Sequence, residues 1–209
     1  MTALIETVRV MGGRAPLWPL HVSRLQAAAS ALNMNLAIPE APAGGADRIM
    51  RYELSCSGTD VTTRDPAVPA PLCLHVSAVQ HPIYPWKTIS RDGFDRAFAE
   101  AEQLGADDAL LLSTDGLIRE ASRWAVVWRR VDGRIGAPPL ASGVLRSVAR
   151  ARLGQLLELV EQELNVEALT RCPVAAMNAA RGLVPVRELG GVALPFWSGW
   201  AQLAGRFWP

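Results

Sequence analysis

"DALLLSTDGLIREASRWAVVWRRVDGRIGAPPL", residues 108–140, decides the fold class expected for this chain. It contains three short apolar runs, which are separated by Asp115-Gly116 and Asp132-Gly133. An Asp-Gly pair between apolar runs is the strongest short-range indication of a β-hairpin, because the turn needs positive φ angles that glycine adopts easily. The segment therefore predicts an antiparallel meander.

Helical patterns lie on both sides of this segment. Residues 90–106 are predicted to form a helix, with Ser90 as the N-cap and Gly105 just past the end. Residues 142–164 have an apolar stripe after a Pro-Pro and a Ser-Gly pair, which predicts a loop leading into a long helix. Residues 196–209 repeat apolar side chains at helical spacing, and we expect them to pack on the core or on a dimer partner. The apolar face of the first helix consists of Phe94, Phe98, Ala101 and Leu104.

The N-terminal part mixes strands with one helix. Residues 4–17 alternate and then break at two glycines, as a strand that enters a hairpin turn would. The alanine-rich segment 21–34 predicts a helix. Residues 49–57 and 72–79 are typical of strands, and the proline-rich segment 62–72 between them is predicted to be a loop.

These patterns indicate an α+β fold with largely antiparallel sheets. We expect a domain boundary near residues 80–85, where an extended segment crosses into a new section of chain. The expected division is a small N-terminal α+β domain over residues 1–82 and a larger domain over residues 83–209.

The composition favours a small-molecule partner. The formal charge is +1 and the basic residues are scattered, so no surface for nucleic acid is indicated. No window has the length and apolarity of a membrane span, and the N-terminus lacks the pattern of a signal peptide, so we expect a cytoplasmic protein without membrane contact. Neither a disulfide framework nor a metal site is expected, because the candidate residues lack the spacing for one. They are Cys56, Cys73, Cys172, His21, His75 and His81.

Lys87 is the only lysine among the 21 lysine and arginine residues. An amine can lose its proton near neutral pH and attack a carbonyl, whereas a guanidinium stays charged. The apolar neighbours Tyr84 and Trp86, together with a helix start just ahead, would lower the pKa of this amine. A compositional accident in an arginine-rich chain is the competing explanation for a single lysine.

The stretch 84–153 resembles the core of the class IV aminotransferase family, the fold-type IV pyridoxal-phosphate enzymes. The shared features are a lysine followed by a helix, then the hairpin "GADDALLL…DG…EAS", then a "P…SG.L…R" loop. The resemblance extends from residues 6–10 to residues 182–186. It implies a small α/β sandwich domain, a larger β-barrel-like domain with helices, and a homodimer whose active sites take residues from both subunits.

The resemblance also implies roles for individual residues. Lys87 matches the catalytic lysine that forms a Schiff base with pyridoxal 5'-phosphate and moves the proton. Glu120 matches the carboxylate that pairs with the pyridine nitrogen, and Arg24 matches the arginine that reaches the cofactor phosphate. The N–H groups of Val148 and Ala149 match the phosphate cup at a helix N-terminus.

The segment "MNAARGLVPV", residues 177–186, resembles the lyase members of the family more than the branched-chain aminotransferases. Asn178 and Ala179 would then lie near the cofactor phosphate and the substrate. The chain departs from the family at Ala125, where an asparagine is usual. It departs again at Ala149, where a hydroxyl that contacts the phosphate is lost and weaker cofactor binding is expected.

The first choice of function is therefore 4-amino-4-deoxychorismate lyase, which forms 4-aminobenzoate and pyruvate in folate synthesis. A branched-chain or D-amino acid aminotransferase that uses the same Lys87, Glu120 and Arg24 is the alternative. A diverged, non-catalytic protein that binds the cofactor is a third hypothesis.

Overall fold

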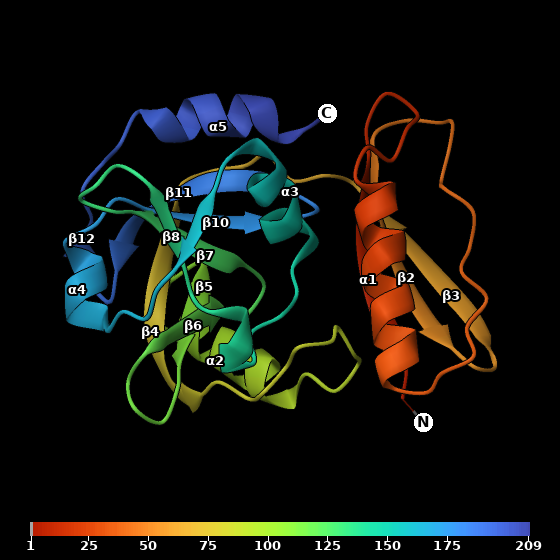
Figure 1. Cartoon of the computed structure of the whole chain (residues 1–209), viewed down its shortest axis with the longest axis horizontal. Helices are drawn as coiled ribbons and strands as arrows, with labels where there is room; N and C mark the ends of the chain where they lie inside the picture. Colours follow the sequence, from red (N-terminus) through yellow and green to blue (C-terminus); the bar gives the residue numbers. More distant parts are fainter. Residues whose placement is uncertain (1) are drawn as a thin grey trace.

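The computed structural model describes residues 2–209. Two units stand side by side, and each is built on its own β-sheet (Figure 1). The smaller unit contains one helix against a three-stranded antiparallel sheet in the order β1-β2-β3. Its elements are β1 (Leu4–Val10), α1 (Trp18–Ala31), β2 (Arg48–Ser55) and β3 (Gly58–Arg64).

The small unit is held together by a shared apolar layer. Residues in β1 and β2 alternate, so one face of the sheet is apolar and turns toward α1. Leu4 and Val8 of this face are buried against Leu25 and Ala28 of the helix. The helix starts at Trp18 and has a proline in its first turn. Proline is tolerated there because N–H groups in the first turn make no hydrogen bond within the helix.

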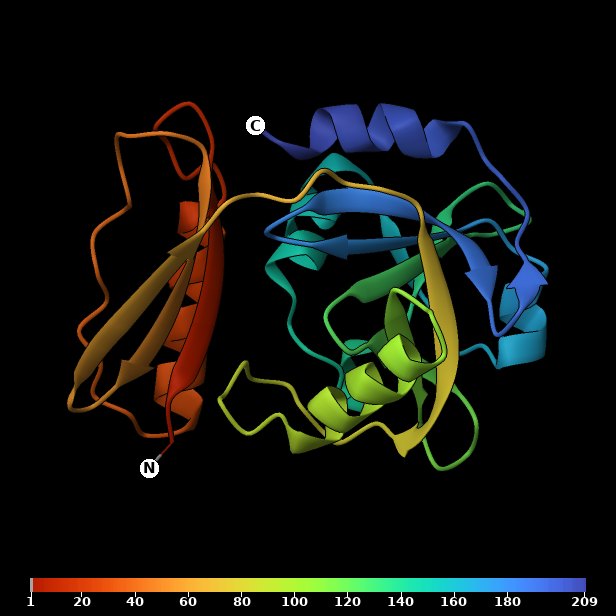
Figure 2. The ribbon, with the colours of Figure 1, turned by 180° about the vertical axis from the view of Figure 1, so that it is seen from behind.

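The larger unit is built on a nine-stranded sheet in the order β6-β5-β4-β11-β10-β7-β8-β9, with β12 paired to β11. The sheet is strongly curled, in the form of a half-barrel (Figure 2). Its strands are β4 (Leu72–Gln80), β5 (Asp108–Leu112), β6 (Ile118–Ala121), β7 (Ala125–Arg129), β8 (Ile135–Ala137), β9 (Leu159–Glu161), β10 (Val174–Asn178), β11 (Gly182–Leu189) and β12 (Val192–Ala193).

Helices pack against several strands of the sheet. α2 packs against β4 and β5, and α5 packs against β11 and α3. The C-terminal helix buries Trp200 and Phe207 in a core that also contains Met177 and Leu153, so the expected packing on the core is confirmed. The helices are α2 (Asp92–Gln103), the 3-10 turn η1 (Leu140–Ser142), α3 (Val148–Leu156), α4 (Val166–Thr170) and α5 (Gly199–Phe207).

The segment that carries Lys87 joins the two units. Ile5 N–H donates to the Lys87 carbonyl at 2.7 Å, and Ile89 N–H donates to the Ala3 carbonyl at 3.0 Å. Thr88 forms an antiparallel bridge with Leu4. Residues 87–89 therefore extend the small sheet along the free edge of β1, although they follow the first strand of the large sheet in the chain.

Both predicted hairpins are confirmed, but the meander is not. Gly116 and Gly133 have φ angles of 73° and 84° in the turns between β5 and β6 and between β7 and β8. The connection between β6 and β7 is not a hairpin. β6 lies at the edge of the sheet and pairs only with β5, while β7 pairs with β8 and β10. β10, which is distant in sequence, thus lies beside β7 where the meander would have placed β6.

Several other local predictions were wrong. The long helix expected after the Ser-Gly pair begins at Val148, where its apolar stripe starts, but it ends at Leu156 and the chain continues extended into β9. Ser90 does not cap α2, since the N-cap is Arg91 without a side-chain hydrogen bond, and Leu104 is 63% exposed. The hairpin turn expected at Gly12-Gly13 is present, however, because Met11 and Arg14 form an antiparallel bridge across it before the chain enters α1. Strand β3 was missed because none of its residues is buried and no alternation marks it.

The sheets favour a different boundary from the one expected. β4 belongs to the nine-stranded sheet, so a division at residue 82 would separate this strand from its sheet. The connection between β3 and β4, residues 65–71, is the segment that passes from one sheet to the other. The division into domains itself stays a prediction, with this segment as the better position.

The remaining general expectations concern absences. Within residues 2–209, no helix is long and apolar enough to cross a membrane. The same residues contain no group of three or more His, Cys, Asp or Glu side chains arranged to hold a metal ion. The three cysteines are free thiols.

Candidate active site

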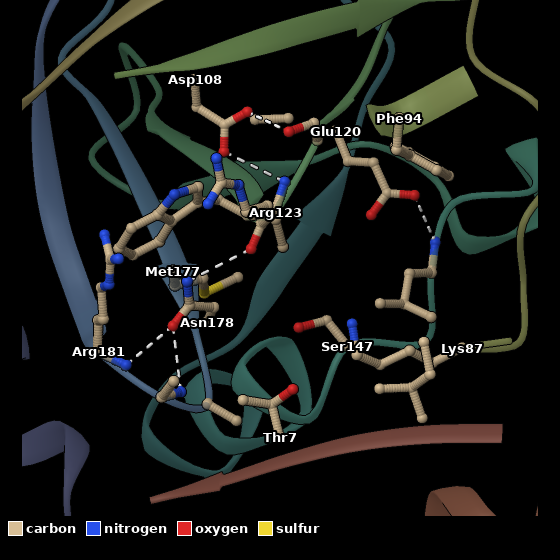
Figure 3. Close-up of a pocket in the computed structure, with 18 of the residues that line it drawn as sticks. Thr7, Lys87, Phe94, Asp108, Glu120, Arg123, Ser147, Met177, Asn178 and Arg181 are labelled. Atoms are coloured by element: carbon tan, nitrogen blue, oxygen red, sulfur yellow. Dashed lines mark hydrogen bonds between the residues drawn. The ribbon is translucent and has the colours of Figure 1, made fainter. Parts of the chain in front are cut away.

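A cavity of about 400 Å³ lies between the two units (Figure 3). Its walls come from β1, β2, β3 and α1 of the small unit and from six segments of the large one. The residues predicted from the sequence converge on it, although they are spread over more than 150 positions of the chain. Those that line it are Arg24, Lys87, Glu120, Val148, Asn178 and Ala179.

Ala149 is the exception among the predicted residues. It does not line the cavity, and its side chain is fully buried in the core beside Leu153. Ala125, the other departure from the family pattern, lines the cavity with a methyl group where a polar side chain is usual.

Lys87 is partly buried in the cavity wall. Burial lowers the pKa of its amine from the usual 10.5 to about 7, because the charged form is poorly solvated there. The nearby cations Arg91 and Arg24 lower this pKa further, whereas Glu6 and Glu120 act in the opposite direction. A large fraction of the amine is therefore neutral at neutral pH, as a nucleophile or a base requires.

Glu120 lies in β6 with a side chain that is 7% exposed. One of its oxygens, Oε1, accepts hydrogen bonds from His81 Nε2 at 2.8 Å and from the Leu145 N–H at 2.9 Å. The other oxygen, Oε2, has no hydrogen-bond partner in the described part of the chain. The carboxylate is thus fixed through one oxygen and offers the second to a donor in the cavity.

Arg24 projects from α1 and is held by Glu6 of β1. Arg24 Nε donates to Glu6 Oε1 at 2.8 Å, and a second guanidinium nitrogen donates to Glu6 Oε2. His21 also contacts Glu6 through Nδ1, and all three side chains are less than a tenth exposed. Burial alone would raise the pKa of the Glu6 carboxyl, but Arg24 and His21 together lower it to about 2.

The N-terminus of α3 faces the same cavity. Ser147 is its N-cap, and the Ser147 hydroxyl accepts a hydrogen bond from the Arg150 N–H at 3.4 Å. The N–H groups of Val148 and Ala149 have no acceptor among residues 2–209, as is normal for the first turn of a helix. Arg24 NH1 lies 3.5 Å from the Arg146 carbonyl, so this guanidinium is adjacent to the free amides.

Asn178 ends β10 and organises the turn into β11. Its Oδ1 accepts from the N–H groups of Ala180 at 3.1 Å and Arg181 at 2.8 Å. Its Nδ2 donates to the Arg123 carbonyl at 3.3 Å. The amide thus shapes the cavity wall, and Ala179 in the same turn lines it.

The sequence did not indicate how many arginines surround the cavity. Besides Arg24, five more line it, and in the sequence each looks like one of many scattered basic residues. Only the folded arrangement brings these segments together, so no local pattern could have identified them. They are Arg51, Arg64, Arg91, Arg123 and Arg181.

The residues present fit pyridoxal phosphate. The fit rests on an amine with a pKa near 7, a carboxylate oxygen without a partner, and free helix amides beside an arginine. Lys87 would bind the aldehyde, Glu120 Oε2 would accept from the pyridine N–H, and the α3 amides with Arg24 would hold the phosphate. The Ser147 hydroxyl also lines the cavity, at the helix end where the Ala149 methyl replaces the family's hydroxyl.

The fold and this site define the class of a pyridoxal-phosphate-dependent enzyme. Residues 57–189 match the family model of the class IV amino-transferases. This match covers more than half of the chain, so the chain belongs to the class IV aminotransferase family. No curated protein matches it.

Solved structures share the fold over nearly the whole chain. A hypothetical aminotransferase from Mycobacterium tuberculosis in its PLP-bound form has a TM-score of 0.82 and 20% identity, covering 98% of this chain and 88% of that one. A branched-chain aminotransferase from Thermoproteus uzoniensis has a TM-score of 0.82 and 18% identity, with 98% and 84% covered.

A candidate 4-amino-4-deoxychorismate lyase from Legionella pneumophila subsp. pneumophila str. Philadelphia 1 has a TM-score of 0.80. It is 17% identical, with 98% of this chain and 91% of that chain covered. Lyases and aminotransferases thus have similar scores, and the fold alone does not distinguish the two reactions.

Proposed function

We propose that this chain is a 4-amino-4-deoxychorismate lyase. The observation that carries the proposal is the number of arginines in the cavity wall, six in all. The cofactor phosphate needs one or two cations, and an ordinary amino acid brings a single carboxylate. The lyase substrate has two carboxylates, one on its ring and one on its enolpyruvyl group. It can therefore form ion pairs with more of these arginines than an ordinary amino acid can.

The proposed reaction uses Lys87 to move one proton. When bound, pyridoxal phosphate withdraws electrons from the ring carbon that carries the substrate amine. The neutral Lys87 amine takes the proton from that carbon, and the electrons left behind break the bond between the ring and the enolpyruvyl oxygen. The ring becomes aromatic as 4-aminobenzoate, and the Lys87 ammonium returns the proton to the enolpyruvate carbon, which yields pyruvate.

Glu120 and Arg24 have positioning roles in this proposal. Because His81 and Leu145 fix one oxygen of Glu120, the other is held toward the cavity without needing to reorient. Arg24 is fixed by Glu6 in the same way. Both groups are therefore arranged before the cofactor binds, which reduces the entropy lost on binding.

The test is product formation by purified protein with added pyridoxal phosphate. We expect pyruvate and 4-aminobenzoate from 4-amino-4-deoxychorismate without any keto acid. Lys87→Ala should give neither product and is the matched control for contaminating enzymes. Strict dependence on 2-oxoglutarate, with glutamate formed from leucine or D-alanine, would identify the aminotransferase alternative instead. A protein that shows a visible cofactor band after addition of pyridoxal phosphate, but forms no product in either assay, would support the non-catalytic hypothesis.

We also propose a homodimer in the cytoplasm. Two apolar side chains close to the catalytic lysine, Ile83 and Ile89, are 83% and 41% exposed, as side chains that a second subunit covers would be. The three free thiols suit a reducing compartment. Light scattering on the purified protein tests the dimer, and a mass of one chain, 22.5 kDa, would contradict it.

A further inference from the structure

Two of the cavity arginines, Arg123 and Arg181, come from connections that meet at one edge of the large sheet. Arg123 lies between β6 and β7, and Arg181 lies in the turn between β10 and β11. β7 and β10 pair in antiparallel fashion, with Ala125 opposite Met177, so the start of one strand adjoins the end of the other. Figure 3 shows both arginines on the side of the cavity away from Lys87 and Glu120.

Asn178 and aromatic rings fix these two arginines. Asn178 bonds to both backbones, through the Arg123 carbonyl and the Arg181 N–H. The Arg123 guanidinium lies over the Phe98 ring, and the Arg181 guanidinium is 5.5 Å from the centroid of the Trp124 ring. Stacking on a ring holds the plane of a guanidinium while its N–H edges stay free to donate.

Neither guanidinium has an anionic partner. Among residues 2–209, no carboxylate oxygen lies within 4.0 Å of either group. The neighbouring carboxylate of Asp108 already accepts from the Ser122 hydroxyl and from two backbone N–H groups. Two cations therefore face the cavity without a carboxylate in direct contact.

Burial is the main influence on the Arg123 guanidinium, and it lowers the pKa of this group. The charges of Asp108 and Glu102 act in the opposite direction, while the like charges of Arg181 and Arg91 add to the lowering to a smaller extent. A carboxylate placed between Arg123 and Arg181 would stabilise the poorly solvated charge of Arg123, and each arginine can donate two parallel hydrogen bonds to a carboxylate.

We propose that Arg123 and Arg181 form a carboxylate clamp that makes this site selective for dicarboxylates. The clamp binds the carboxylate that lies farther from Lys87, while the rest of the substrate reaches the amine. The inference rests on the proposed function, because it assigns one of the two substrate carboxylates to particular side chains.

The test measures selectivity between two probes that differ by one negative charge, isophthalate and its monomethyl ester. Their dissociation constants are determined by calorimetry on the protein reconstituted with pyridoxal phosphate. We expect wild type to bind isophthalate at least about tenfold more tightly than the ester, as one additional charge-assisted pair would give. In the double variant Arg123→Gln with Arg181→Gln, the ratio should fall to about one.

Two controls separate recognition from folding. Arg171→Gln removes an exposed arginine that pairs with Glu167 outside the cavity, and the ratio should stay at the wild-type value. Arg181→Lys keeps the charge but loses the planar fork, so an intermediate ratio is expected. The visible band of the bound cofactor shows that each variant is folded.

Two results would overturn the clamp: a wild-type ratio near one, or a double variant that keeps the wild-type ratio. The assay for pyruvate distinguishes this failure from failure of the proposed function. If the wild type releases pyruvate but the double variant keeps the wild-type ratio, the clamp proposal is wrong and the lyase proposal stands. If the double variant loses selectivity but the wild type releases no pyruvate, the lyase proposal is wrong and the two arginines bind another dicarboxylate.

Discussion

The two sides of the cavity differ in how their charges are balanced. On the side of α1 and β6, the charged groups Glu6, Arg24 and Glu120 each have partners inside the protein. On the opposite side, Arg123 and Arg181 stack on aromatic rings and have no carboxylate partner within 4.0 Å in the described chain. Ion pairs within the protein hold charged side chains in position for a cofactor of fixed shape. Charged side chains without such a pair can instead be neutralised by a ligand.

The two sides also differ in what the family resemblance indicates for them. The paired side contains Lys87, Glu120 and Arg24, which match the family's lysine, carboxylate and phosphate-binding arginine. The unpaired side contains Asn178, which the resemblance places near the substrate, together with two arginines that no family pattern indicated. We therefore expect changes on the first side to affect catalysis and folding, and changes on the second side to affect the choice of substrate.

The largest effect is expected at Lys87. Lys87→Ala and Lys87→Arg should both lower the turnover of whichever reaction the wild type catalyses by about 10² to 10⁴-fold, since neither can act as a neutral amine. Steady-state rates with saturating substrate measure this. Substantial activity in Lys87→Arg would show that only the charge matters and would contradict the proton transfer proposed for this residue.

Glu6→Gln should be the most destabilising change on the paired side. It leaves the buried Arg24 and His21 without their anion, and breaking such a pair costs about 3 kcal/mol in the free energy of unfolding. Urea unfolding at pH 7 measures the loss. Glu53→Gln is the matched control, because Glu53 pairs with Arg51 at an exposed position and should change stability by less than about 1 kcal/mol.

This effect has a definite pH dependence. The pKa of Glu6 is about 2 in the folded protein, below its usual value of 4.5, so its contribution is complete above pH 4.5. It is lost as the pH falls toward 2. The difference in stability between wild type and Glu6→Gln should therefore shrink on acidification, and a constant difference down to pH 2 would contradict the low pKa.

Lys87 should make stability rise with pH as well, but on the alkaline side. Between pH 7 and 10.5 the unfolded chain holds a proton on this amine that the folded protein has released. Stability therefore rises with pH by up to about 1.4 kcal/mol per pH unit from this group. The difference between wild type and Lys87→Met, measured by urea unfolding without cofactor from pH 6 to 9, should show this slope. Parallel curves for the two proteins would contradict the lowered pKa.

The smallest effect on stability is expected at Arg181. Arg181→Gln removes no ion pair and relieves the repulsion with Arg123, so the free energy of unfolding should change by less than about 0.5 kcal/mol. The same urea titration tests this. A loss as large as that of Glu6→Gln would mean that the two sides of the cavity do not differ in the way their charges suggest.

The sequence predicted those features whose cause is local. The turns at Gly116 and Gly133 follow from glycine in an Asp-Gly pair, and α2 ends just before Gly105 as its pattern indicates. The lowered pKa of Lys87 has the predicted direction, but part of its cause is distant in the chain, since burial and Arg91 act on the amine together with Arg24.

The features that were missed depend on contacts between distant segments. The apolar stripe after Leu156 continues in the sequence, but Leu159–Glu161 pairs with β8 and leaves the helix. Edge strand β3 has no buried face and so no alternation. Arg123 and Arg181 are 58 positions apart in number, and only the pairing of β7 with β10 brings them together.

Because the only lysine side chain of the protein lines the cavity, a reagent that is usually indiscriminate becomes directed here. Amine-selective acylating agents modify lysines over the whole surface of most proteins. Among the side chains of this one, they have a single target. Apart from the α-amino group of the first residue, a small acylating agent would thus react at Lys87 alone, where it would inhibit, and the label on Lys87 would count the accessible sites in a preparation.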